Sequence, residues 1–189
     1  MKKYNITNIK VLVFAGVLTA MSIILTRVVA IPIGTSIRLS VGQTPVYLCG
    51  FWFGPLVGGI CGFLSDFVGA ILQGYAPNPM ISLTAILAGV LPGLFRRFVL
   101  KKMELWKVLA VIALHGIVGS LGLTCIGLHM YYGTPWAVIY AQRTVQTLLL
   151  VPLNAVVVFF LYKSPLTTML QKSVMARGNM SVQAQEHGR

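Results

Sequence analysis

Five apolar stretches dominate this 189-residue chain. A helix that crosses a lipid bilayer needs about 20 mostly apolar residues. Four stretches come close to that length, namely 9–29, 80–96, 107–130 and 136–162. The fifth, 41–72, is too long for one crossing and contains Gly54-Pro55, a pair that ends a helix and permits a turn. We therefore expect helices at 42–53 and 55–72. The fold class predicted is an all-α integral membrane protein, a compact bundle of six transmembrane helices within 1–163, followed by a polar tail at 164–189.

The composition excludes a soluble domain and a disordered chain. Hydrophobic residues make up 57% of the sequence and charged residues 10%, whereas a soluble domain carries roughly 25% charged residues. Disorder requires a much lower hydrophobicity. Cys49, Cys61 and Cys125 lie inside apolar stretches without the spacing of a disulfide framework or a zinc site. We expect all three to be small apolar packing residues.

The basic residues predict the orientation in the membrane. The formal charge is +12, but the charges gather between apolar stretches, which is the pattern of the positive-inside rule and not of nucleic-acid binding. Twelve of the fifteen fall in three clusters: Lys2, Lys3 and Lys10; Arg96, Arg97, Lys101, Lys102 and Lys107; Lys163, Lys172, Arg177 and Arg189. With six crossings all three clusters share one side. We expect a multi-pass protein of the cell membrane with both termini and the tail cytoplasmic, and the loops 30–40, 73–80 and 131–135 outside.

Four ionisable residues are not explained by this topology. Arg27, Arg38 and Arg143 are basic, Asp66 is acidic, and the predicted topology places all four in the outer half of the membrane. Charged groups at such depth usually face a cavity or a partner. Three cations against one anion leave an excess of about +2, which favours a pocket for an anionic ligand, because Arg binds carboxylates with two parallel hydrogen bonds. The alternatives are contacts of Arg27 and Arg38 with lipid headgroups, and a structural ion pair between Asp66 and Arg143.

Polar residues on the last predicted helix support the pocket. Arg143 and Gln146 lie on one face at helical spacing, Asn154 extends that face, and Gln142 lies beside it. A polar stripe on an otherwise apolar helix points into the bundle. The loop 73–80 adds Tyr75 and Asn78 as candidate substrate contacts.

Enzyme signatures are missing from the sequence. It contains no HExxH, no GxSxG and no phosphate-binding GxxxxGK[ST]. His115 and His129 have no carboxylate nearby in sequence, so we expect neither catalysis, nor a metal site, nor a cofactor. Without an ATP site the chain cannot drive uptake by ATP hydrolysis. We therefore expect a binding subunit whose transport is powered by another subunit.

The motifs resemble a known family of such subunits. Leu25-Thr26-Arg27, Ile37-Arg38-Leu39-Ser40, Phe53-Gly54-Pro55 and the run Gly58-Gly59, Gly62, Asp66-x-x-Gly69-Ala70 are similar to the substrate-binding S components of energy-coupling factor (ECF) vitamin transporters. Leu83-x-Ala85-x-Leu87-x-Gly89 and Gly93-Leu94-Phe95 resemble the folate-specific branch. The resemblance covers about residues 9–163.

The resemblance implies a function and partners. An S component binds its vitamin on the outer side of a six-helix bundle and associates with a transmembrane T subunit and two ATP-hydrolysing subunits, so ATP is used by the partners. The small residues of the first helix typically face the T subunit, which makes Ala15, Gly16 and Ala20 docking candidates. In the folate branch the arginine that ends the first helix is a ligand contact, which falls on Arg27. Folate carries two carboxylates for the arginines, and its pterin offers N–H groups that Asp66 could accept.

One segment departs from the folate branch, which usually has a Phe-Pro-Gly-Phe stretch in the third loop. Here the loop reads Ala76-Pro77-Asn78-Pro79-Met80, and Tyr75 is the nearest ring. Folate is the leading hypothesis. The alternatives are an S component for another anionic vitamin such as pantothenate, a small autonomous channel or facilitator, and an intramembrane enzyme that uses His115.

Overall fold

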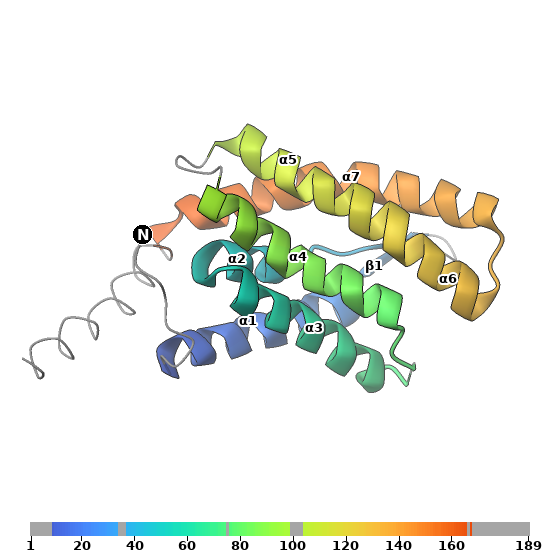
Figure 1. Ribbon diagram of the computed structural model, residues 1–189, viewed down its shortest axis with the longest axis horizontal. Helices are drawn as coiled ribbons and strands as arrows, with labels where there is room; N and C mark the ends of the chain where they lie inside the picture. The colour runs from blue at the N-terminus through green and yellow to red at the C-terminus, as the bar shows by residue number, and fades with distance from the viewer. Residues whose placement is uncertain (1–8, 34–36, 75, 99–103, 166, 168–189) are drawn as a thin grey trace, which may run out of the picture.

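A computed structural model describes residues 9–33, 37–74, 76–98, 104–165 and 167 of the chain. Figure 1 shows a bundle of roughly antiparallel helices. The four uninterrupted long helices are α1 (Ile9–Arg27), α3 (Pro55–Leu72), α4 (Pro79–Phe98) and α7 (Trp136–Lys163). A further rod joins α5 (Leu105–His115), the π-helical segment η1 (Gly116–Thr124) and α6 (Cys125–Tyr132). The remaining helix, α2 (Thr44–Phe53), is short.

The all-α membrane fold predicted from the sequence is confirmed, with one refinement to the number of crossings. Among the described residues, five helical segments are long and apolar enough to cross a membrane. Helix α2 has ten residues and is therefore about 15 Å long at 1.5 Å per residue, half the thickness of the hydrocarbon core. The described part of the bundle thus has six helices, of which five are long apolar spans.

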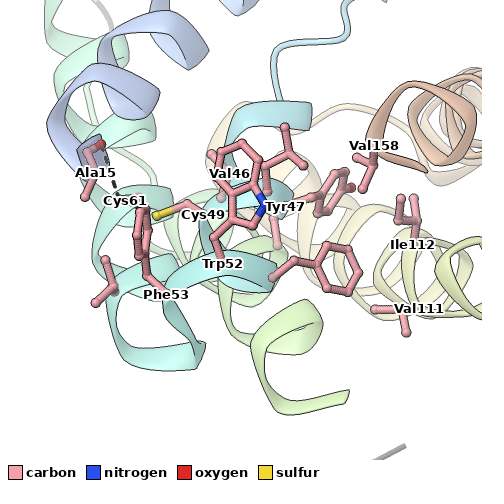
Figure 2. Close-up of a cluster of buried hydrophobic side chains, with 14 of the residues drawn as sticks. Ala15, Val46, Tyr47, Cys49, Trp52, Phe53, Cys61, Val111, Ile112 and Val158 are labelled. Carbon is pink, nitrogen blue, oxygen red and sulfur yellow. Dashed lines mark hydrogen bonds between the residues drawn. The ribbon is translucent and has the colours of Figure 1, made fainter. Parts of the chain in front are cut away.

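Helix α2 forms the centre of the core. All ten of its residues are buried, and its side chains extend in opposite directions. Figure 2 shows Tyr47 directed toward Ile112 and Val158, while Cys49 points toward Cys61 and Ala15 on the other side. The three described cysteines are free and buried, as expected for packing residues. A helix that is apolar all round requires neighbours on every side, which explains why this short helix is so deeply enclosed.

Glycines allow the helices around α2 to approach closely. Gly54 has a φ of 97°, a conformation that residues with a Cβ rarely adopt, and it separates α2 from α3. A Cβ added at Gly89 of α4 would collide with the carbonyl of Gly58 in α3, and one at Gly62 would collide with the carbonyl of Ala85. Small residues at such crossings are typical of helix packing in membranes.

The segment 30–40, expected to be a loop, contains a short antiparallel strand pair. Strand β1 (Ile31–Ile33) pairs with β2 (Ile37–Leu39), and Pro32 stands opposite Arg38. Ile residues have a high β propensity, which explains pairing in a segment otherwise marked as irregular by its proline. Strand β2 packs against α7. The chain after it is tied to α1, because the hydroxyl of Ser22 donates to the carbonyl of Gly42 at 2.6 Å.

The two ends of the bundle differ in charge. The start of α1 and the ends of α4 and α7 lie at one end, and the α3–α4 and α6–α7 connections lie at the other (Figure 1). The basic residues Lys10, Arg96, Lys107 and Lys163 therefore belong to the first end. We call it the basic end, and the opposite end the loop end. The other predicted cluster residues and most of the tail 164–189 lie outside the described residues or have side chains that do.

Candidate functional site

An elongated cavity runs along α7 between α2, α5 and η1. Its volume is about 80 Å³. The α7 residues that line it extend from Arg143 to Asn154, eleven residues apart, which corresponds to about 16 Å along the helix axis. We call it the α7 cavity. Its lining consists of Gln43, Tyr47, Ile112, His115, Gly116, Ser120, Arg143, Gln146, Thr147, Leu150, Val151 and Asn154.

Arg143 lies at the end of the cavity nearer the loop end. It is about 10 Å along α7 from Trp136, and its guanidinium donates to Oε1 of Gln146 at 3.2 Å. Its side chain is half-buried. Within the described ranges the acidic side chains are Asp66 and Glu104, and these form ion pairs with Arg27 and Lys107. Arg143 therefore has no carboxylate partner in the part of the chain that the structure describes.

The other end of the cavity, around Asn154, is lined by polar side chains that are hydrogen-bonded to one another. We call it the inner end. Asn154 donates to the carbonyl of Leu150 at 2.8 Å and accepts from the hydroxyl of Thr44 at 2.7 Å. Tyr47 lies with its hydroxyl 2.8 Å from Oε1 of Gln43 and 2.8 Å from Nδ1 of His115. These bonds tie α2 to α5 and α7, since buried polar groups need partners. The cavity thus has a cation at one end and neutral polar groups at the other.

Arg27 and Asp66 form a separate cluster between α1, α3 and α4. The guanidinium of Arg27 donates to Oε1 of Gln73 at 2.8 Å, and its Nη2 lies 3.8 Å from Oδ1 of Asp66. Ser82 donates to the other oxygen of Asp66 at 2.8 Å. The guanidinium also lies directly over Gly69, where a Cβ would contact Nε at 2.8 Å. Asp66 therefore pairs with Arg27 and not with Arg143.

The remaining predicted substrate contacts occupy other places. Asn78 is buried, accepts from the backbone N–H of Met80 at 3.0 Å and donates to the carbonyl of Gly127 at 3.2 Å. It caps the start of α4, a role for which asparagine is well suited. Arg38 has its backbone in β2, but its side chain lies outside the described part. Tyr75 lies wholly outside the described residues.

The predicted docking residues line an apolar groove between α1 and α3. This α1–α3 groove has a volume of about 440 Å³. Gly16 opens directly onto it, because a Cβ there would meet no other atom within 4 Å. Its lining consists of Val11, Leu12, Ala15, Gly16, Thr19, Ala20, Ile23, Val57, Ile60, Cys61, Leu64 and Val68.

Half of the cavity's polar lining was not predicted from the sequence. Gln43, Tyr47, Ser120 and Thr147 were not predicted, and His115 was considered only as an enzyme residue. Gln43 directly precedes helix α2 and Tyr47 lies in its first turn, and only the tertiary contacts of α2 with α5 and α7 bring these residues to the cavity. One sequence feature could have found His115 and Ser120, namely isolated polar residues inside the apolar stretch 107–130.

Comparisons with known proteins place the chain in a family. Residues 6–166 match the family model described as ECF-type riboflavin transporter, S component. The folate transporter FolT of Clostridium novyi (strain NT) is 31% identical over 166 residues, which are 86% of this chain and 91% of that protein.

Solved structures agree with this assignment. FolT bound with folic acid has a TM-score of 0.70 and 28% identity, and the match covers 82% of this chain and 95% of that one. The S component for biotin has a TM-score of 0.63 at 17% identity, covering 87% and 95% of the two chains. ThiT from Listeria monocytogenes has a TM-score of 0.58 at 18% identity, and the match covers 82% of this chain and 92% of that one. The last two show the fold alone.

The family settles the general function. S components bind the substrate, and ATP is hydrolysed by separate subunits, so this chain is a transporter subunit and not an enzyme. The resemblance noted in the sequence is confirmed by the family model and by the FolT relatives. The chain belongs to the substrate-binding S components of the energy-coupling factor transporters.

Proposed function

We propose that this S component captures folate from outside the cell and delivers it inward with a T subunit and two ATP-hydrolysing subunits. The curated relative is FolT, at 31% identity. The solved structure at 28% identity is also FolT, and it is bound with folic acid. The family model carries riboflavin in its description, so riboflavin is the comparison that an experiment must include. The choice between them rests on the chemistry of the α7 cavity.

Arg143 is the observation that carries the folate proposal. Riboflavin has no carboxylate, whereas the glutamate of folate carries two. A half-buried guanidinium without an acidic partner among the described residues suits an anion, because an uncompensated charge within a membrane is costly. The planar guanidinium can donate two parallel hydrogen bonds to one carboxylate. Gln146, already bonded to Arg143, holds it in place.

The length of the α7 cavity suggests how folate lies in it. About 16 Å separate Arg143 from Asn154 along α7, which suits an elongated molecule. The glutamate would lie at Arg143, nearer the loop end, and the pterin would lie at the inner end among Gln43, Tyr47 and Asn154. In this orientation the two charges of the ligand remain near the membrane surface.

The cavity must enlarge to admit folate. Its volume of about 80 Å³ is well below the roughly 300–1,000 Å³ of typical small-molecule sites. Strand β2 packs against α7, and Gln43, which lines the cavity, follows the strand pair by four residues. We infer that displacement of the β1–β2 pair from α7 opens the site and that its return covers the ligand.

The other predicted substrate contacts stay predictions, and the structure supports them less than Arg143. Arg27 and Asp66 neutralise each other, and Asn78 is committed to Met80 and Gly127. Arg38 and Tyr75 also stay predictions, because the side chain of Arg38 and all of Tyr75 lie outside the described residues.

Docking of the T subunit is proposed for the α1–α3 groove. Ala15, Gly16 and Ala20 all line it, as the resemblance implied, and its lining is almost entirely apolar. An exposed apolar groove on a helix face with small residues permits another helix to approach closely. The α7 cavity shares no lining residue with this groove, so docking there would leave the ligand site free.

A titration of the purified chain distinguishes the substrates. Binding of folate, riboflavin and pantothenate is followed by heat or by the fluorescence of Trp52, Trp106 and Trp136. Saturable binding of folate alone supports the proposal, and saturable binding of either comparator instead of folate overturns the substrate while keeping the family. The channel alternative is tested in liposomes that contain the chain alone, where folate flux without the ATP-hydrolysing subunits would contradict the proposal.

A further inference from the structure

A chain of four hydrogen-bonding groups leads from α4 to the inner end of the α7 cavity. The carbonyl of Thr84 lies 3.1 Å from Nε2 of His115, whose Nδ1 lies 2.8 Å from the hydroxyl of Tyr47. That hydroxyl is in turn 2.8 Å from the side-chain amide of Gln43. Tyr47 and His115 are each 2% exposed, whereas Gln43 is exposed and lines the cavity. The chain therefore runs from a buried carbonyl to the ligand space.

The positions of the hydrogens follow from the fixed end of this chain. A backbone carbonyl can only accept, so Nε2 of His115 must carry the hydrogen. A neutral imidazole has one ring N–H, and a charged ring buried in a membrane without a carboxylate partner would be costly. Nδ1 is then an acceptor, and the single hydroxyl hydrogen of Tyr47 is donated to it.

The same logic orients Gln43. With its hydrogen committed to His115, the Tyr47 oxygen can only accept from the glutamine. A half-turn of the Gln43 amide exchanges Oε1 and Nε2, which have nearly the same shape, and the network decides which atom faces Tyr47. The nitrogen must face Tyr47, and Oε1 then turns toward the cavity. Asn154, the neighbouring amide, is already committed to Thr44 and Leu150.

We propose that the His115–Tyr47–Gln43 chain fixes Gln43 as a hydrogen-bond acceptor at the inner end of the α7 cavity and so selects a ligand whose ring nitrogen N3 carries a hydrogen. This inference rests on the proposed folate function. The 4-oxopterin ring of folate presents N3–H beside an exocyclic amino group, and both are donors. A 2,4-diaminopteridine, as in methotrexate, keeps amino donors at C2 and C4 but presents a bare N3 lone pair between them, which would repel Oε1. Tyr47 and His115 act through Gln43 as positioning residues.

The test compares folate with methotrexate on the full chain in detergent. Both carry the same glutamate, so Arg143 treats them alike. We expect the unaltered protein to prefer folate by about tenfold or more, because a site built around one hydrogen-bonding pattern rejects an analogue that lacks it. Tyr47→Phe frees the amide to rotate and should reduce the preference to about threefold or less. Tyr140→Phe is the control. Tyr140 is an exposed residue of α7 that lies outside the cavity lining and the hydrogen-bonded chain, so this change should leave the preference for folate unchanged.

Each outcome separates the two proposals. If folate binds and Tyr47→Phe keeps the full preference, or if the unaltered protein binds both compounds equally, the specificity inference is overturned and the folate function stands. If neither compound binds, the folate function fails, and the hydrogen order is tested without ligand.

That second measurement is the ¹⁵N spectrum of histidine-labelled protein. The signals of His115 are identified by eliminating those of the other two histidines with His129→Gln and His187→Gln. A hydrogen on Nε2 and a bare Nδ1 support the inference. A hydrogen on Nδ1, or on both nitrogens, overturns it. This measurement also decides the matter if Tyr47→Phe fails to fold.

Discussion

Arg27 of α1 and Asp66 of α3 form an ion pair, with Nη2 and Oδ1 separated by 3.8 Å. Ser82 of α4 joins the pair through the second carboxylate oxygen, so one charged cluster ties three helices together near the loop end. The pair changes how the intramembrane charges are distributed. The acid that could have neutralised Arg143 is paired with Arg27, and Arg143 has no acidic partner among the described residues.

The pair should contribute to stability as a coupled unit. Arg27→Gln and Asp66→Asn should each lower the free energy of unfolding, and the double variant should lose less than the sum of the two, with a coupling of about 0.5–3 kcal/mol. Thermal or denaturant unfolding in detergent of the four proteins measures this. Simple additivity would show that the two side chains do not interact.

Close contact of α3 and α4 should make Gly89 intolerant of a methyl group. Gly89→Ala would press a Cβ against the carbonyl of Gly58 and should destabilise the protein by about 1–3 kcal/mol. Gly16→Ala is the matched control, because a Cβ there meets open space, and a helical Gly→Ala change should stabilise by about 0.5–1 kcal/mol. Equal effects on the unfolding temperature would contradict the packing described.

A bulky residue in the α1–α3 groove should block assembly without affecting the ligand site. Gly16→Leu should bind folate like the unaltered chain and fail to co-purify with the T subunit and the ATP-hydrolysing subunits. Ala137→Leu makes a similar change at an exposed position of α7 and should assemble normally. Normal assembly of Gly16→Leu would move the docking surface elsewhere.

The charge difference between the two ends predicts the topology. Tyr131→Cys lies at the loop end and should react with a membrane-impermeant thiol reagent in intact cells, whereas Lys163→Cys at the basic end should react only after permeabilisation. The native cysteines are buried and give a low background. The reverse pattern would mean that the ligand site faces the cytoplasm.

The sequence predicted the fold class because its evidence is local. Apolar stretches and the Gly54-Pro55 break define helices without any knowledge of their neighbours. The features it missed depend on tertiary contacts. The π-helical turns of η1 continue an ordinary apolar pattern between α5 and α6, and the β1–β2 pair needs two three-residue strands to meet across a turn.

The candidate site was predicted only where its residues share one helix. Arg143, Gln146 and Asn154 share a face of one helix, so their spacing placed them together and the structure lines one cavity with all three. The partner of Asp66 was not predicted, because Asp66 and Arg143 stood at a similar predicted depth of roughly 10 Å, whereas Arg27 was expected at the outer end of its helix. The structure pairs Asp66 with Arg27. Gln43, Tyr47 and His115 come from different elements, and only packing of α2 on α5 brings them to one hydrogen-bonded chain.

The central claim is that Arg143 neutralises an anionic vitamin in the α7 cavity, and a folate titration of Arg143→Gln tests it most directly. Calorimetry on the unaltered chain, Arg143→Gln and the basic-end control Lys163→Gln gives the three affinities, with unfolding temperatures to confirm that each is folded. We expect Arg143→Gln to weaken binding at least about tenfold, or ~1.5 kcal/mol, the lower range for a hydrogen bond to a charged group, and Lys163→Gln to bind as before. Unchanged affinity in a folded Arg143→Gln protein would contradict the account.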